Sequence, residues 1–351
     1  MPSKPVKIPH RSADSIAREI IAAGHFPVPL EPRSKRPSEE GWSKSHITIE
    51  EVSARFPATC NVGILTGITG LVDLDLDCDE AIALSDEYLP DTGWIWGRRG
   101  RPRSHWLYRL KGDMPSTMKL ADPRNDEERG MLVELRTNGH QTIYPGSTHP
   151  SGEKVKWVTH QQPAEVEPHT LVRRAKHLAA ACLIARSWDP GSRDEIAAAL
   201  IGALDNYGWT EADIKAFLGP ILSLVGDEES RDRLKKIERT PRARAAGGHI
   251  YGLPKLQEKL GTEVVNKLVE WLELYNRRSP SPSRLPLDLR SAFDIVNTPT
   301  KASWLLRPYL EEYAIAVLSG DYGTFKSFLA LDWALHLATG KHWHNDPRGS
   351  K

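Results

Sequence analysis

Three aspartates at alternate positions of one short segment constrain this chain more than any other feature. In VDLDLDCDE, Asp73, Asp75 and Asp77 are separated by Leu74 and Leu76. Residues two apart on a β-strand point to the same face, so the three carboxylates share one face and the leucines the other. Like charges this close repel unless a cation lies among them, and oxygen-only ligands favour Mg²⁺ or Mn²⁺.

Two other interpretations of the acidic segment can be weighed from its residues. An EF-hand calcium loop is excluded, because its sixth position is Cys78 in place of glycine and its twelfth is Leu84 in place of glutamate. A solvated strand edge that carries acids without a metal stays open from the segment alone.

Further polar residues lie in later strand-like segments. In MLVELRT, Glu134 and Arg136 share one face of the expected strand and can supply a third metal ligand and a phosphate contact, or simply form a wet face. His105 lies in SHWLYRL, where a lone histidine is more often structural than catalytic. The preceding GRRGRPR (97–103) carries four arginines and is either a polyphosphate cradle or a solvated loop.

Composition narrows the class of protein. The 351 residues correspond to two or three domains at roughly 150 residues each. The formal charge of +1 excludes a uniformly basic nucleic-acid-binding surface. Cys60, Cys78 and Cys182 form no CxxC pair, which excludes a disulfide framework and a cysteine-rich zinc site. Residues 1–20 lack the apolar core of a secretory signal, and no run of about eighteen apolar residues occurs, so we expect a cytoplasmic protein without membrane contact.

The pattern of apolar residues changes near residue 165. Before it, helical periodicity is confined to 13–23 and 79–87, and short β-type runs dominate. These expected strands cover 61–67, 70–77, 104–110, 131–137 and 141–147. From 170 to 275 nearly every segment is helical, including a helix opened by Thr210 with Asp213 as its cap.

A Pro- and Ser-rich segment without enough apolar groups for a core follows the helices and is interpreted as a linker. An apolar run over 313–320 predicts a buried strand, and 328–340 predicts a helix ended by Gly340. The expected organisation is an α+β domain, an all-α domain, a linker and the start of a further domain, over 1–165, 166–276, 277–290 and 291–351.

The order of these motifs resembles the archaeo-eukaryotic primase superfamily, in particular the bifunctional DNA primase/polymerase domain of phages and plasmids. The similarity includes FPVPLEPRSKRPSEEGW (26–42), the acid strand, Ser104 and His105, and VELRTNGHQTIYPGSTHPSG (133–152). It covers nearly all of residues 1–160. The resemblance implies a primase-polymerase catalytic domain, with an RRM-like antiparallel sheet beside an N-terminal α/β unit.

The resemblance also implies a two-metal nucleotidyl transferase that makes and extends primers on single-stranded DNA from nucleoside triphosphates. Mg²⁺ or Mn²⁺ would be held by Glu134 and two of the three aspartates. Counting from Gly70 favours Asp75 with Asp77, and Asp73 with Asp75 stays open. The residues implied to contact the nucleotide are Lys35, Arg101, Arg103, Ser104, His105, Arg136, Ser147 and His149.

The helical segment carries GWTEADIKAFL and ERTPRARAAGGHIYGLPKLQEKLG, which resemble the helical primase C-terminal module. Within it, residues 231–244 contain seven basic side chains against Asp232 and Glu238. This stretch either follows template phosphates or forms a solvated helix face.

Near the end of the chain, Gly320, Gly323, Lys326 and Ser327 lie in GDYGTFKS, which fits the phosphate-loop pattern except that Phe325 replaces its second glycine. The segment resembles the start of a RepA-type hexameric helicase ATPase. The chain stops before a second acidic strand, so we expect a fragment without a competent ATPase, linked to a replicative helicase in the same or a neighbouring chain.

Two other functions stay open from the sequence. The fold can serve as a replication-initiator or single-stranded DNA binding platform, or the chain can be a helicase subunit whose activity lies in the ATPase. The retained carboxylates and His105 favour the enzyme.

Overall fold

The computed structural model describes residues 11–275, 304–306, 309–311, 316–321, 323–339, 341 and 343. The chain forms two compact units, Met1–Ser281 and Pro282–Lys351, which are described separately. The expected linker over 277–290 lies outside the described residues.

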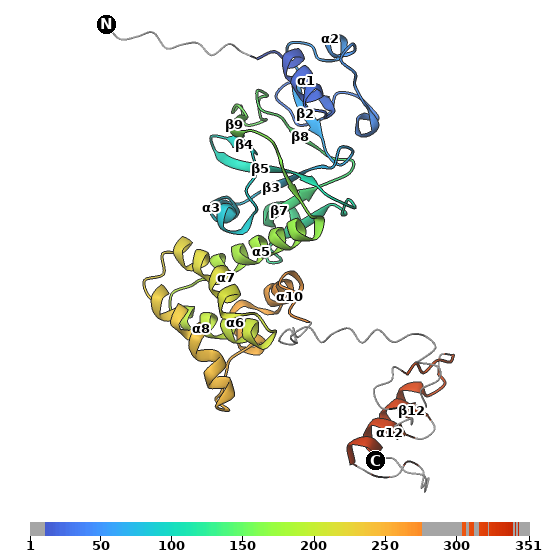
Figure 1. Cartoon of the computed structure of the whole chain (residues 1–351), viewed down its shortest axis with the longest axis vertical. Coiled ribbons are helices and arrows are strands. Elements are labelled where there is room, and N and C mark those ends of the chain that lie inside the picture. Colours follow the sequence, from blue (N-terminus) through green and yellow to red (C-terminus); the bar gives the residue numbers. More distant parts are fainter. Residues whose placement is uncertain are drawn as a thin grey trace, which may run out of the picture. The chain divides into compact units, whose positions relative to one another are not determined.

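The first unit begins with a small lobe built on one helix and a three-stranded sheet (Figure 1). Helix α1 (Ala13–Ala22) buries Ile16, Ala17 and Ile20 against this sheet because these residues recur at helical spacing. The sheet is antiparallel in the order β1-β2-β8, with β1 at Pro27–Leu30, β2 at Asn61–Leu65 and β8 at Gln141–Ile143. Two short helices, η1 (Trp42–Lys44) and α2 (Val52–Arg55), complete the lobe.

A larger antiparallel sheet follows, in the order β6-β7-β3-β5-β4-β9. Its strands are β3 (Leu71–Leu76), β4 (Trp94–Arg98), β5 (Arg101–Leu110), β6 (Met118–Ala121), β7 (Met131–Arg136) and β9 (Lys156–His160). Strand β10 (Ala164–Val166) joins β5 in parallel, and the short helix α4 (Glu127–Gly130) precedes β7. The predicted α+β class with an antiparallel sheet is confirmed.

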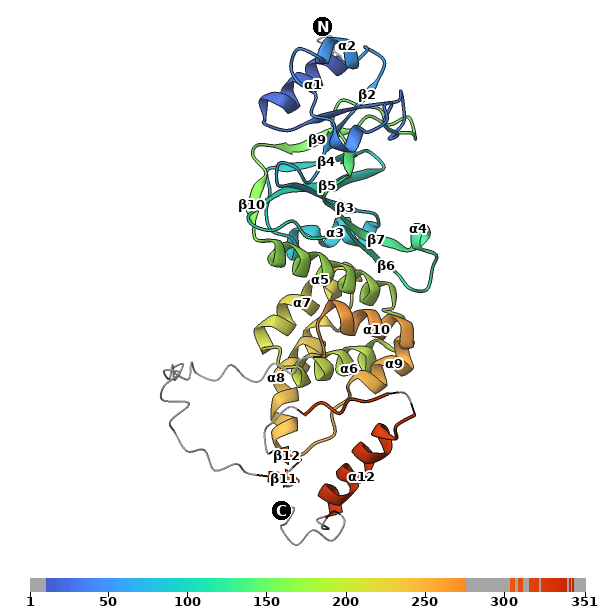
Figure 2. The same ribbon diagram turned by 90° about the vertical axis from the view of Figure 1, so that its right-hand side faces the viewer.

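The two faces of β3 have different environments. Val72, Leu74 and Leu76 pack into a hydrophobic core with α3 (Asp79–Tyr88) and α5 (Pro168–Arg186), which cover one face of the sheet (Figure 2). The opposite face carries the aspartates. On that face, Leu71 of β3 and Leu107 of β5 pack against the small lobe. The aspartates therefore lie on the sheet face that is turned toward the small lobe.

A helical region continues from α5 without a break in the hydrophobic core. It contains α6 (Arg193–Asn206), α7 (Glu211–Leu224), α8 (Ser230–Ala245), α9 (Leu253–Leu260) and α10 (Thr262–Trp271). The expected cap is confirmed, because Thr210 and Asp213 form a reciprocal capping box at the start of α7. No helix among the described residues is long and apolar enough to cross a membrane.

The second unit contains two short strands and one helix among its described residues. Strands β11 (Trp304–Leu306) and β12 (Leu310–Glu311) pair with each other, and α12 covers Lys326–Thr339, close to the helix expected over 328–340. The strand expected over 313–320 is not formed by its described residues, 316–320. Val317 is 86 % exposed there, and no described strand pairs with this apolar run.

The basic stretch of α8 uses several of its cations inside the fold. Arg233 is buried and donates from Nε to Asp227 at 3.0 Å and from Nη1 to Asp194 at 2.9 Å. The side chain of Asp227 is only 1 % exposed, and it also accepts a hydrogen bond from the indole of Trp188. Arg233 thus neutralises a buried carboxylate and is not available to DNA.

We expect Arg233→Ala to lower the free energy of unfolding by about 3 kcal/mol, because it leaves the Asp227 carboxylate buried without its cation. The exposed Arg239 on the same helix forms no direct ion pair among the described residues and is the matched control. Arg239→Ala should stay within about 0.5 kcal/mol of the parent. Urea unfolding followed by circular dichroism measures both, and equal losses would contradict the structural role of Arg233.

Candidate active site

The register of the large sheet brings the acidic motif and the two later motifs together. Asp75 on β3 lies directly opposite His105 on β5 and Glu134 on β7. Asp73 lies opposite Arg136 on β7. Directly paired residues share one face of an antiparallel sheet, so the five side chains converge at its centre.

Exposure rises along β3 toward its carboxyl end. The side chain of Asp73 is fully buried, that of Asp75 is 5 % exposed, and that of Asp77, just beyond the strand, is 33 % exposed. Glu134 on the neighbouring strand is 12 % exposed. The carboxylate cluster therefore opens to solvent at Asp77, and Asp73 forms its closed end.

Arg136 is the cation that compensates this cluster. Its guanidinium lies 2.6 Å from Asp75 Oδ2, 2.7 Å from Glu134 Oε2 and 3.4 Å from Asp73 Oδ2. Burial alone lowers the pKa of Arg136, but the charges of Asp75, Asp73 and Glu134 raise it above its usual value. One permanent positive charge is thus shared among three carboxylates.

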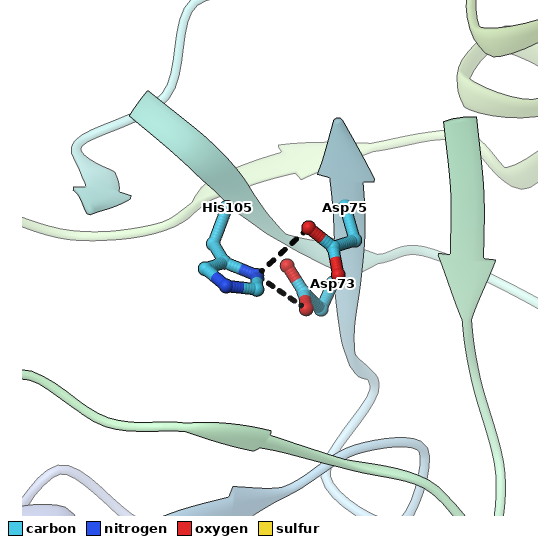
Figure 3. A group of neighbouring side chains, drawn as sticks. All are labelled: Asp73, Asp75 and His105. Atoms are coloured by element: carbon cyan, nitrogen blue, oxygen red, sulfur yellow. Dashed lines mark hydrogen bonds and ion pairs between the residues drawn. The ribbon is translucent and has the colours of Figure 1, made fainter. Parts of the chain in front are cut away.

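His105 faces the two inner aspartates (Figure 3). Its Nδ1 lies 3.1 Å from Asp73 Oδ2, 3.4 Å from Asp75 Oδ1 and 3.2 Å from the hydroxyl of Thr142 on β8. Burial opposes the charged imidazole, but the charges of Asp75 and Asp73 raise the pKa of His105. The other ring nitrogen, Nε2, points away from both aspartates in Figure 3.

Asp75 and Asp77 have opposite pKa shifts. Burial by itself raises the pKa of Asp75, but the charges of Arg136, His105 and Lys35 outweigh it and lower the value to about 2. Burial and the neighbouring charge of Asp75 raise the pKa of Asp77 to about 6. Arg136 and Arg101 oppose this rise only in part. The surrounding cations therefore compensate the repulsion between Asp77 and Asp75 only in part.

These residues fit a divalent cation. Ligand oxygens of Asp75, Asp77 and Glu134 lie within 4.8 Å of one another, and a second group joins Asp73, Asp75 and His105. The first group offers oxygen atoms alone, as Mg²⁺ and Mn²⁺ prefer, and its exposed member gives an ion access from solvent. The raised pKa of Asp77 indicates a negative field that a bound cation would relieve.

Several predicted nucleotide contacts lie around the open end. Arg101 lies 3.5 Å from Asp77 Oδ1. The exposed Lys35 is close enough for its charge to lower the pKa of both Asp75 and Asp77. Burial, Arg98 and Lys35 lower the pKa of His149 to about 4. Lys35 and Arg101 thus act on the charge of the acids, and His149 lies close enough to Lys35 and His105 for their charges to affect its pKa.

Three other predicted contacts have different surroundings. Arg103 donates to Asp86 on α3, with Nη1 at 2.7 Å from Oδ2. Strand alternation places Ser104 on the face opposite to His105. The hydroxyl of Ser147 bonds to both backbone groups of Val62 on β2. Their assignment to the nucleotide stays a prediction.

Comparison with known protein families agrees with this geometry. Residues 17–169 match the family model described as bifunctional DNA primase/polymerase, N-terminal. The chain carries a bifunctional DNA primase/polymerase domain. Residues 279–351 match a second model, described as an AAA domain. A search of curated proteins gives no match to the chain.

The primase/polymerase match spans the small lobe and the large sheet, including every acid of the cluster. Such a domain acts on DNA and nucleotides, and the AAA match points to a linked helicase ATPase. The resemblance inferred from the sequence motifs is therefore confirmed for the catalytic domain and for the ATPase segment.

Thr142 is a site residue of the primase/polymerase domain that the sequence analysis did not identify. It lies on β8 of the small lobe and contacts His105 from outside the large sheet. The segment QTIYPGS was expected to form a strand, but its pairing with β2 depends on tertiary structure. The signal that could have identified Thr142 was a polar residue at a buried position of that strand.

The phosphate-loop residues lie at the start of α12 in the second unit. Lys326 opens the helix and donates from Nζ to the carbonyl of Gly320 at 2.8 Å. Phe325 has a φ of 57°, in the left-handed region that a glycine adopts without strain. The turn keeps the backbone that a glycine at this motif position would adopt, although the residue is phenylalanine.

We expect Asp77→Asn to stabilise the metal-free protein at high pH. An ionised Asp77 costs stability as pH rises from its unfolded pKa of 3.8 to the folded value of about 6. The gain should be near zero at pH 4 and about 1 kcal/mol at pH 8, reduced from the full linkage value because this side chain is partly exposed.

Thermal melts in EDTA at several pH values measure this difference. Added Mn²⁺ should raise the melting temperature of the parent more than that of the variant. The control is Asp113, which is exposed and lies beyond the carboxyl end of β5. Asp113→Asn should change neither the pH dependence of the melting temperature nor its response to Mn²⁺. Equal melting of the Asp77→Asn variant and the parent at pH 8 would contradict the proposed repulsion.

Proposed function

We propose that this protein is a template-directed nucleotidyl transferase that synthesises and extends primers on single-stranded DNA, in phage or plasmid replication. The observation that carries the proposal is the convergence of Asp75, Asp77 and Glu134 at the open end of one cluster, beside His105 and Arg136. In this reaction a 3′-hydroxyl oxygen attacks the α-phosphorus of a nucleoside triphosphate, and the bond to pyrophosphate breaks.

Asp75, Asp77 and Glu134 would hold the divalent ions, Mg²⁺ or Mn²⁺. Bound there, two such ions supply charge stabilisation for the attacking and leaving oxygens. Of the two open pairs of aspartates, Asp75 with Asp77 is supported by the exposure of Asp77 and by the burial of Asp73. The protein provides the geometry, since the pairing of β3 with β7 fixes Asp75 and Glu134, and the amide of Asp77 donates to the carbonyl of Leu132.

The cations around the acids would bind the triphosphate. His105 directs Nε2 away from the aspartates, and Lys35 and Arg101 lie at the open end where a polyphosphate would enter. Arg136 and these residues would neutralise the charge that accumulates on pyrophosphate as it leaves. His149 lies within electrostatic reach of Lys35 and His105 and is a further candidate contact.

The remaining parts of the chain would serve the same process. We propose that the α-helical region assists priming and that the AAA segment belongs to a RepA-like helicase ATPase. In that segment, Gly320, Gly323, Lys326 and Ser327 would cradle phosphate at the start of α12, because helix N-termini favour anions.

The experiment uses the whole chain, a single-stranded template with or without a primer, labelled nucleotides and Mn²⁺. We expect the parent to extend a primer. Asp75→Ala should reduce incorporation by at least about a hundredfold while template binding persists, because the change removes transition-state stabilisation and leaves the exposed cations in place.

Asp113→Ala is the matched control and should retain full incorporation. A parent that binds template but incorporates no nucleotide would favour the DNA-binding platform over the enzyme. If Asp75→Ala kept substantial extension and Asp73→Ala were inactive, the metal-binding pair would shift to the other register.

A further inference from the structure

Asp73 differs from the other acids of the site in its burial and in its contacts. Its side chain is fully buried, and Oδ1 has no hydrogen-bond partner among the described residues. Its other oxygen, Oδ2, accepts from His105 Nδ1 at 3.1 Å and lies 3.4 Å from Arg136 Nη1. A buried carboxylate needs compensation, and Asp73 obtains it from the guanidinium of Arg136 and the imidazole of His105.

The contacts of Asp73 restrict the imidazole of His105. Around Nδ1 lie the carboxylates of Asp73 and Asp75, which as ions only accept hydrogen bonds, and the hydroxyl of Thr142. Nδ1 must therefore carry a proton, so the ring edge that bears Nε2 is the one left for a ligand. Figure 3 shows that the edge carrying Nδ1 is turned to the aspartates.

Solvent access also separates Asp73 from the metal-binding acids. Asp75 belongs to both of the candidate metal-binding clusters. Of these two clusters, only the one that contains Asp77 and Glu134 reaches solvent. An ion bound beside Asp73 would have to displace His105 from its best hydrogen bond.

We propose that Asp73 is a positioning residue, which holds His105 with Nδ1 protonated and Nε2 directed at the nucleotide, and is not a metal ligand. The inference rests on the proposed function for the identity of the ligand at Nε2. Its geometric part concerns Asp73 and His105 alone.

Kinetics and metal binding of Asp73→Asn test the inference. The variant should raise the KM for the nucleotide by about tenfold, the effect of losing one charge-assisted hydrogen bond. Its Mn²⁺ affinity should change by no more than about threefold, because a neighbouring charge acts on the ion only at a distance. Asp75→Asn is the matched comparison and should lose Mn²⁺ binding, as titration calorimetry measures without any nucleotide.

A double-mutant cycle separates positioning from a general effect on folding. In a His105→Gln background, Asp73→Asn should change the KM by no more than about twofold, since the group through which it acts is gone. An equal KM increase in both backgrounds would overturn the inference. So would a Mn²⁺ affinity that falls as far as in Asp75→Asn.

Nitrogen NMR of the unsubstituted protein in EDTA keeps the test independent of folding and of activity. The His105 signals are assigned by their loss in His105→Gln. Nδ1 should be protonated between pH 6 and pH 9, whereas an unprotonated Nδ1 would contradict the inference. Failure of the proposed function alone would leave this result and the Mn²⁺ affinities unchanged.

Discussion

The guanidinium of Arg136 is the interaction on which the acidic face of the large sheet depends. Asp73 and Asp75 are both almost fully buried, and without compensation their charges would oppose folding. Arg136 reaches Asp73, Asp75 and Glu134 because the register of β3 and β7 places it directly opposite Asp73. A strand that carries alternate aspartates can thus lie at the centre of the sheet.

This compensation is graded along the strand, and the gradient separates the acids by role. At the closed end, Asp73 and Asp75 are matched by Arg136 and His105, so the pKa of Asp75 falls to about 2. At the open end, Arg136, Arg101 and Lys35 offset only part of the effect of burial and of the charge of Asp75, and the pKa of Asp77 rises to about 6. At the closed end, the ion pairs hold the side chains in place. At the open end, the negative field that attracts a cation is retained.

The sequence predicted the common face of the aspartates, because alternation on a strand is a local property. It also predicted Glu134 and Arg136 on one face of a second strand, and the register then brought both strands together. The burial of Asp73 could not be predicted, since exposure depends on how the small lobe covers the sheet. The same limit applies to Thr142, which reaches His105 through the pairing of β8 with β2.

Charged residues in the helical region show why composition alone could not decide which basic side chains are available to DNA. Arg233 and Arg239 belong to the same basic stretch of α8, yet Arg233 neutralises the buried Asp227 and Arg239 is exposed. A count of basic residues assigned both to the same surface. Only the fold distinguishes a cation that stabilises the helical region from one that is available to a template.

The position of the acid strand is fixed from both of its faces. Val72, Leu74 and Leu76 anchor β3 in the core shared with α3 and α5, whereas Leu71 belongs to the core of the small lobe. A shift of β3 by one residue would exchange the leucines for the aspartates and place charges against α5. The hydrophobic residues between the aspartates therefore set the register on which the carboxylate geometry depends, and β8 from the small lobe fixes His105 against it.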